Sequence, residues 1–100
     1  MPPFGMHVKF TAQSGKRDTL LELLLEAASA MESVPECRLY FVNVTDTEPD
    51  TIWVTEVWND EAAHQASLAD EATKAAIQQA MPLIAGVEAI RYRPVGGKGL

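Results

Sequence analysis

Two neighbouring segments, residues 38–45 and 51–58, constrain the fold more than any other part of the sequence. Both are dense in β-branched and aromatic side chains, which favours strands, and the polar stretch 46–50 between them predicts a hairpin loop. Each segment carries large residues at both its odd and its even positions, which lie on opposite faces of a strand. Trp53 is on one face and Trp58 is on the other. Because a sheet with one face in water alternates more cleanly, we expect both faces of this sheet to be covered.

The flanking segments predict two further strands and three helices. The strand patterns cover residues 4–11 and 87–94. The helical patterns cover residues 16–34, 61–69 and 70–81. Pro35 ends the first helix, and Asn59 and Asp60 can cap the second. Gly86 separates the last helical pattern from the last strand pattern. The order is therefore strand, helix, strand, strand, helix pair, strand.

This order predicts an α+β, ferredoxin-like βαββααβ fold, with an antiparallel four-stranded sheet and its helices on one face. The other face still carries apolar side chains, and a chain this short has no further element to cover it. The simplest cover is a second copy of the same sheet. We therefore expect a homodimer with the sheets packed face to face, as a dimeric α/β barrel.

Composition narrows the class of protein. One hundred residues predict a single domain over 1–100, in which residues 95–100 form a flexible tail. The net charge of −6, with scattered basic residues, argues against nucleic-acid and membrane-surface binding. No apolar run is long enough for a membrane span, and the first residues do not resemble a signal peptide. We expect a cytoplasmic protein whose single cysteine, Cys37, is a small buried or edge residue.

The sequence contains none of the common motifs that indicate a cofactor or a metal site. There is no glycine-rich phosphate loop, no nucleophile elbow and no paired metal-ligand spacing, and the two histidines, His7 and His64, lie far apart in the chain. If the protein is an enzyme, we expect it to work without a cofactor or a metal.

Residues 56–64 (Glu-Val-Trp-Asn-Asp-Glu-Ala-Ala-His) join a strand end to a helix start in a way that resembles the antibiotic biosynthesis monooxygenase domain. Residues 10–23 resemble the strand, Gly-Lys and helix entry of that family, and residues 73–86 resemble its third helix and exit. The resemblance covers about residues 6–94. It implies a dimer of ferredoxin-like units, each with a pocket between sheet and helices. It also implies oxidation of electron-rich aromatic or quinol substrates by O2, without metal, flavin or haem.

The resemblance also implies roles for particular residues. Trp58 matches the strand-end tryptophan whose N–H can donate to a substrate oxygen, and His64 matches a polar ring residue that could act as base. Ser67 stands where many relatives have a second histidine, and Val54 stands where the anthrone-oxidising type has an asparagine. The third helix lacks the iron-ligand histidine of haem-degrading relatives, which leaves haem degradation a minor alternative.

Other polar strand residues are open to more than one interpretation. The residues that could line either the pocket or the dimer interface are His7, Arg38, Tyr40, Arg91 and Tyr92. Among them, His7, Tyr40 and Tyr92, together with Ser67, are predicted to bind substrate. Glu56 is expected to pair across the sheet with Arg38, Arg91 or Arg93 as a structural contact.

Two functions remain open at this point. The first is a cofactor-independent monooxygenase that acts on a small aromatic or quinol-type substrate. It requires a mostly apolar pocket that Trp58 and His64 both reach. The second is a non-catalytic dimeric ligand-binding or stress-related protein of the same fold, which the replacements at Ser67 and Val54 favour.

Overall fold

The computed structural model describes residues 2–99. Its elements follow the chain in this order: β1 (Phe4–Ala12), α1 (Arg17–Met31), β2 (Cys37–Val44), β3 (Thr51–Trp58), α2 (Glu61–Ala69), α3 (Glu71–Ala80), a 3-10 turn η1 (Met81–Leu83) and β4 (Ile84–Tyr92). The strands form one antiparallel sheet in the order β2-β3-β1-β4. This confirms the predicted ferredoxin-like α+β fold.

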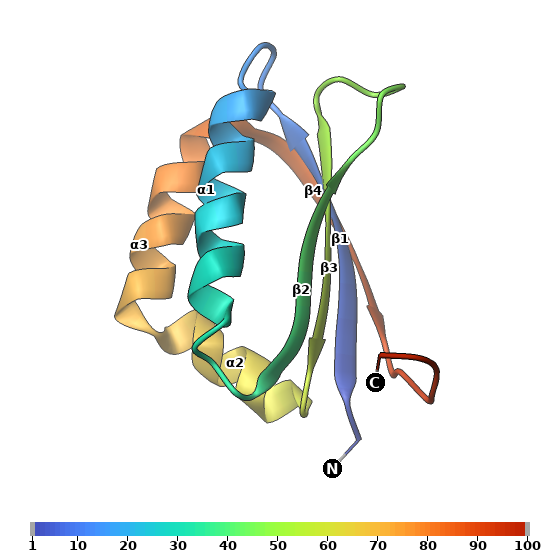
Figure 1. Cartoon of the computed structure of the whole chain (residues 1–100). Helices are drawn as coiled ribbons and strands as arrows, with labels where there is room; N and C mark the ends of the chain where they lie inside the picture. The colour runs from blue at the N-terminus through green and yellow to red at the C-terminus, as the bar shows by residue number, and fades with distance from the viewer. Residues whose placement is uncertain (1, 100) are drawn as a thin grey trace.

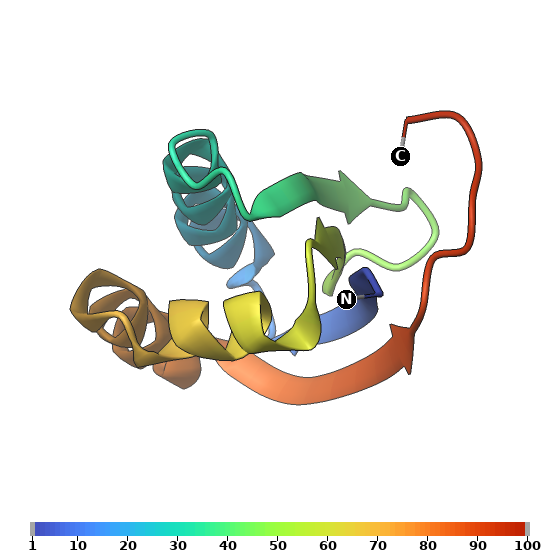
Figure 2. The ribbon, with the colours of Figure 1, turned by 90° about the horizontal axis from the view of Figure 1, so that it is seen from below.

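The molecule has two layers. The three helices lie on one side of the sheet and leave the other side uncovered (Figure 1). Seen from below, α1 lies on the β2 side of the sheet, whereas α2 and α3 lie on the β4 side (Figure 2). The helix layer therefore has two parts that cover different strands.

Two predicted boundaries differ from the observed ones by three residues, each for a local reason. The first helix ends at Met31 rather than at residue 34, because the Ser33 hydroxyl donates to the Ala30 carbonyl and turns the chain before Pro35. The last strand begins at Ile84 rather than at residue 87, and Gly86 lies inside it, paired with Thr11 of β1. A glycine is tolerated there because β4 is an edge strand next to an irregularity in β1.

The core lies between α1 and the middle of the sheet. Leu20 of α1 is fully buried and packs in one cluster with Ile52 and Val54 of β3. From β1, the period-2 pattern sends Met6 and Val8 into the same cluster, as the sequence predicts. These residues fix which face of the sheet meets the helices.

The uncovered face of the sheet, called the outer face below, is rich in apolar and aromatic side chains. Phe41 of β2 is 58% exposed and Ile90 of β4 is 61% exposed. In the centre of this face, the ring of His7 stacks on Trp53 at a centroid distance of 5.0 Å. Large apolar side chains that remain in water are the feature that a second layer would cover.

Candidate functional site

The junction between β3 and α2 brings the end of a strand next to the first turns of a helix. Asp60 begins α2, because its carboxylate accepts a hydrogen bond from the Ala63 amide at 2.8 Å. This cap confirms the predicted helix start. It lets the chain turn sharply, so that His64 packs back against Trp58, with 5.7 Å between their ring centroids.

Trp58 and His64 are both buried, at 2% and 6% exposure. The Phe4 ring lies on another side of the imidazole, with 5.1 Å between the centroids. His64 is therefore an interior residue and not a surface histidine. The two residues that the family resemblance singled out meet in the interior of the protein.

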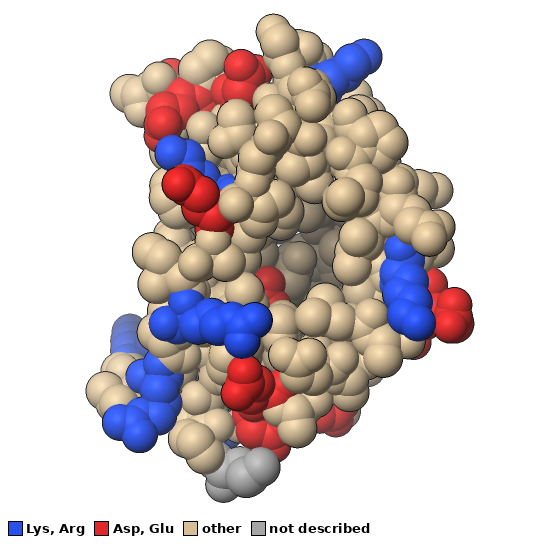
Figure 3. Space-filling model, turned by 180° about the vertical axis from the view of Figure 1, so that it is seen from behind, with Lys and Arg blue, Asp and Glu red and all other residues tan. Residues whose placement is uncertain are grey.

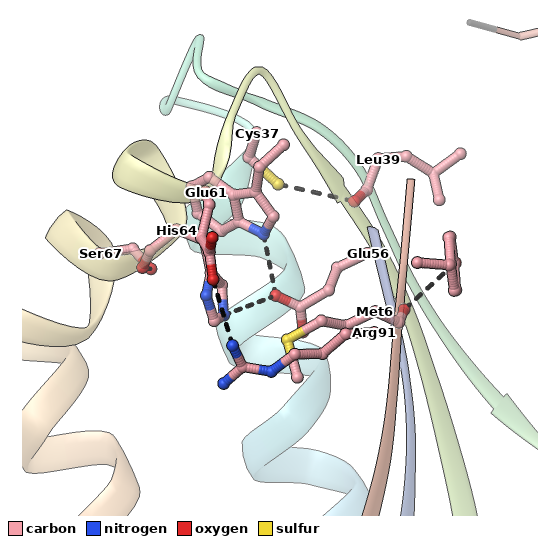
Figure 4. A network of polar contacts seen from close by, with 10 residues as sticks. Met6, Cys37, Leu39, Glu56, Glu61, His64, Ser67 and Arg91 are labelled. Carbon is pink, nitrogen blue, oxygen red and sulfur yellow. Dashed lines mark hydrogen bonds and ion pairs between the residues drawn. The ribbon is translucent and has the colours of Figure 1, made fainter. Parts of the chain in front are cut away.

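Glu56 joins these two residues, and Figure 4 shows it beside His64. Its Oε1 accepts a hydrogen bond from the Trp58 indole N–H at 2.8 Å and lies 3.5 Å from Nε2 of His64. The expected cross-sheet pairing of Glu56 with an arginine is therefore wrong. Residues 56 and 58 lie on the same face of β3 because strand side chains alternate, and this spacing was the signal in the sequence that could have found the contact.

Two of the three arginines that were expected to pair with Glu56 have other partners. Arg38 donates to the side-chain oxygen of Asn59 at 2.8 Å. Arg91 of β4 donates to Glu61 at the start of α2, at 3.2 Å. Arg91 thus links the edge strand to the helix that carries His64, and both side chains of this ion pair are more than half exposed.

Burial dominates the electrostatics of His64. It lowers the pKa of the imidazole below its ordinary value, and the nearby Arg91 lowers it further, while Glu56 and Glu61 act in the opposite direction. Since burial prevails, His64 is neutral at neutral pH. Its Nδ1 is sealed from solvent and has no hydrogen-bond partner among residues 2–99.

Tyr40 and Ser67 lie near this group. Tyr40 is paired with Glu56 in the β2–β3 register, and burial together with the Glu56 charge raises the pKa of its phenol, so it stays protonated. Ser67 is one turn beyond His64 on α2, and its hydroxyl donates to the His64 carbonyl at 2.6 Å. The fold thus brings Ser67 and Tyr40 into the neighbourhood of Trp58 and His64.

His7 and Tyr92 are not brought to the same place. Both lie on the outer face, opposite the helices, because they occupy β1 position 7 and the register position opposite Gly5, which alternate with the core residues Met6 and Val8. His7 Nδ1 lies 3.1 Å from the Thr55 hydroxyl, and the Tyr92 hydroxyl donates to the Met6 carbonyl at 3.3 Å. The Tyr92 ring lies directly over Gly5, where any Cβ would overlap it.

Cys37 begins β2 and is half-buried. Its thiol contacts the Leu39 carbonyl at 3.6 Å, and burial raises the pKa of the thiol. Burial therefore works against the thiolate, which is the nucleophilic form. The place of Cys37 on the edge strand β2 agrees with the buried or edge position expected for it.

A hollow lies between β4 and the α2–α3 part of the helix layer. It is visible from behind, with acidic atoms inside it (Figure 3). Val87 and Ala89 point to the helix side of the sheet yet remain exposed, and none of the described residues of α3 is buried. Glu56 is the acidic residue that the strand register places on this side of the sheet.

A second, open groove of about 580 Å³ runs along the outside of this region. Phe4, Glu61 and Tyr92 are among the residues that line it, whereas Trp58 and His64 do not. Since Phe4 also contacts the His64 ring, the groove ends one side chain away from the buried group.

Within residues 2–99, no group of three or more histidine, cysteine or acidic side chains is arranged to hold a metal ion. None of the helices in the described range is long and apolar enough to cross a membrane.

The fold and the strand–helix junction together define a ferredoxin-like domain with a polar group buried beside an open sheet–helix cleft. The family model for antibiotic biosynthesis monooxygenases matches residues 3–79, and the chain belongs to this family. Family membership and the 41%-identical structure described next support a monooxygenase-like function.

Several solved structures are similar to this chain. A protein from Chloroflexus aurantiacus J-10-fl, provisionally named an antibiotic biosynthesis monooxygenase, is 41% identical, with 95% of each chain covered and a TM-score of 0.86. A Caulobacter crescentus CB15 protein with the same provisional name is 21% identical, covers 95% of this chain and 92% of its own, and has a TM-score of 0.88. One from Deinococcus radiodurans is 23% identical, with 94% of each chain covered and a TM-score of 0.83.

At the level of identity of the last two structures, the likeness shows the fold alone. No protein of curated function matches the sequence.

Proposed function

We propose that the protein is a cofactor-independent monooxygenase that oxidises a small aromatic or quinol-type substrate with O2, in the cleft between β4 and the helices α2 and α3. The observation that carries the proposal is the buried group of Glu56, Trp58 and His64 beside that cleft. A neutral imidazole next to a carboxylate, with apolar walls around both, suits a ring that must lose a proton away from water.

The reaction balances without an external reductant. A hydroquinone and O2 give a hydroxyquinone and one water: one oxygen atom enters the ring, and the other leaves with two hydrogens of the substrate. The substrate supplies all four electrons that O2 accepts. The protein has to bind the ring, accept a proton from its hydroxyl group and exclude bulk water while the electrons pass to oxygen.

Each residue of the site has a part in this proposal. His64 and Glu56 form the acid–base pair that removes the substrate proton, and Tyr40 and Ser67 complete the polar side of the pocket. In the free protein the Trp58 N–H donates to Glu56. Donation from Trp58 to a substrate oxygen, which the family resemblance implies, therefore requires that this hydrogen bond be exchanged when substrate binds.

We also propose that two copies pack through their outer faces to form a homodimer. The exposure of Phe41 and Ile90 supports this arrangement, and in it His7 and Tyr92 belong to the subunit interface rather than to the pocket. Sedimentation analysis should give twice the chain mass, and Phe41→Lys should shift the protein toward the monomer. A wild-type protein that sediments as a monomer at micromolar concentration would contradict the dimer.

The direct test of the activity is O2 uptake by chelator-treated protein with a panel of hydroquinones, naphthoquinols and anthrones, after subtraction of autoxidation. We expect uptake with at least one of these compounds, and we expect Trp58→Phe and His64→Ala to reduce it. Uptake that neither substitution changes would remove both residues from the site. A rate equal to autoxidation across the panel would refute the monooxygenase proposal.

A second function, ligand binding without catalysis, has support from particular contacts. The Trp58 N–H and the Ser67 hydroxyl are both engaged within the protein, and Val54 offers no donor where the anthrone-oxidising type has one. Tight binding of an aromatic ligand without O2 consumption would favour this alternative.

A further inference from the structure

We propose that Glu56, through its Oε2 atom, is the group that receives the substrate hydroxyl, and that His64 acts behind it as a positioning residue. This inference rests on the proposed function, and it identifies which atom of the buried group meets the substrate. It also limits the substrate to an uncharged ring that carries a free hydroxyl.

The two oxygens of the Glu56 carboxylate have different surroundings. Both contacts with neighbouring side chains use Oε1, which accepts from Trp58 and faces Nε2 of His64 (Figure 4). Oε2 has no hydrogen bond to any residue in the range 2–99, and it is not one of the sealed, unpartnered atoms of that range. The side chain keeps 11% of its surface exposed. Oε2 is therefore the oxygen of this carboxylate that is free to accept a hydrogen bond from a molecule outside the protein.

His64 cannot offer an equivalent atom to the cleft. Its Nδ1 is enclosed by protein, and its Nε2 faces Oε1 of Glu56. The neutral imidazole lies beside the carboxylate, with 3.5 Å between its Nε2 and Oε1 of Glu56, and it restricts the positions that the carboxylate can take. The histidine thus orients and polarises Glu56 instead of contacting the ligand.

Charges around Glu56 select the ligand. The titratable groups next to Glu56 are His64 from α2 and Tyr40 and Cys37 from β2, and the charges next to His64 are those of Glu61 from α2 and Arg91 from β4. The single cation among them, Arg91, already pairs with Glu61. A ligand with a carboxylate or phosphate would meet an uncompensated Glu56, whereas a neutral phenol can donate its hydroxyl hydrogen to it.

A carboxylate is a weak base for a resting phenol, but it suffices when the proton leaves together with an electron. As the ring passes one electron to O2, its O–H bond becomes strongly acidic. The bond breaks, its electron pair stays on the substrate oxygen, and the proton binds Oε2 of Glu56. When the reduced oxygen adds to the ring as a peroxide, it takes this proton back, and loss of water leaves the carbonyl group.

The test compares anaerobic binding of a hydroquinone with binding of its dimethyl ether, so that it does not depend on turnover. The wild-type protein should prefer the free hydroxyl compound by about 10- to 100-fold, the range for a hydrogen bond to a charged group. Glu56→Gln should reduce this preference to about twofold or less. Glu22→Gln, the same change on the solvent side of α1, should leave the preference intact. Preference that Glu56→Gln retains would overturn the proposal.

A second measurement on the wild-type protein guards against misfolding of the variant. Nitrogen NMR of His64 should show that Nδ1 keeps its resonance when the hydroquinone binds, because the ligand contacts Glu56. A large shift of Nδ1 would mean that the imidazole accepts the hydroxyl hydrogen, which would also overturn the proposal. If the ligand binds as expected but no O2 is consumed, the monooxygenase proposal fails while the assignment of Glu56 stands.

Discussion

The two parts of the helix layer cover the sheet in different ways. Under α1, Leu20 and its β3 neighbours Ile52 and Val54 lose nearly all their contact with water. Opposite β4, the helix-facing residues Val87 and Ala89 remain exposed, and α3 buries none of its described residues. Stability is therefore concentrated in the half of the sheet that α1 covers, called the closed half below. The half formed by β4, α2 and α3, called the open half, has the room that a ligand needs. Glu56 and Trp58 lie on β3, at the boundary between the two halves.

The largest effect on stability should come from shortening a buried side chain in the closed half. Leu20→Ala removes a fully buried side chain, and we expect it to lower the free energy of unfolding by about 2–5 kcal/mol. Ile77→Ala on α3, where the side chain is 43% exposed, should cost less than about 1 kcal/mol. Denaturant unfolding measures both. Equal losses would show that the two halves are packed alike.

A smaller effect is expected at the boundary. Trp58→Phe keeps most of the buried ring but removes the N–H that donates to Glu56, and we expect a loss of about 1–3 kcal/mol. Trp53→Phe, the same substitution on the outer face, breaks no hydrogen bond of its indole nitrogen among the described contacts. It should therefore destabilise the protein less in the same denaturant titration. If Trp53→Phe costs as much, the Glu56 contact contributes nothing to stability.

The smallest effect is a pH dependence of stability that comes from His64. Because burial lowers its pKa in the folded protein, the unfolded chain binds the proton more tightly. The part of the free energy of unfolding that depends on His64 is therefore fully present above pH 6.5, the ordinary pKa of histidine, and it is lost as the pH falls below that value. For one proton the slope is at most about 1.4 kcal/mol per pH unit.

His64→Gln should flatten the stability profile between about pH 7.5 and about pH 5.5. His7 is present in both proteins, so the difference between their profiles isolates His64. Parallel profiles for the two proteins would mean that His64 is not desolvated in the folded state.

The sequence predicted the closed half better than the open half. Strand alternation in β1 and helical spacing in α1 report directly on which side chains share a face, so the fold and its core could be predicted. The face of Tyr92 depends on its register with Gly5, a pairing between residues far apart in the chain. Glu56 was misassigned because its partners come from a strand end and a helix, and cross-strand charge pairing considers neither.

The most direct test of the central claim is oxidation of a hydroquinone by chelator-treated protein under isotopically heavy O2. Our account predicts a hydroxyquinone that carries one heavy oxygen atom, with the other recovered in water, and it predicts little of this product from Glu56→Gln. A product without heavy oxygen, or equal labelling by the wild-type protein and by Glu56→Gln, would contradict a monooxygenase site in the open half of the molecule.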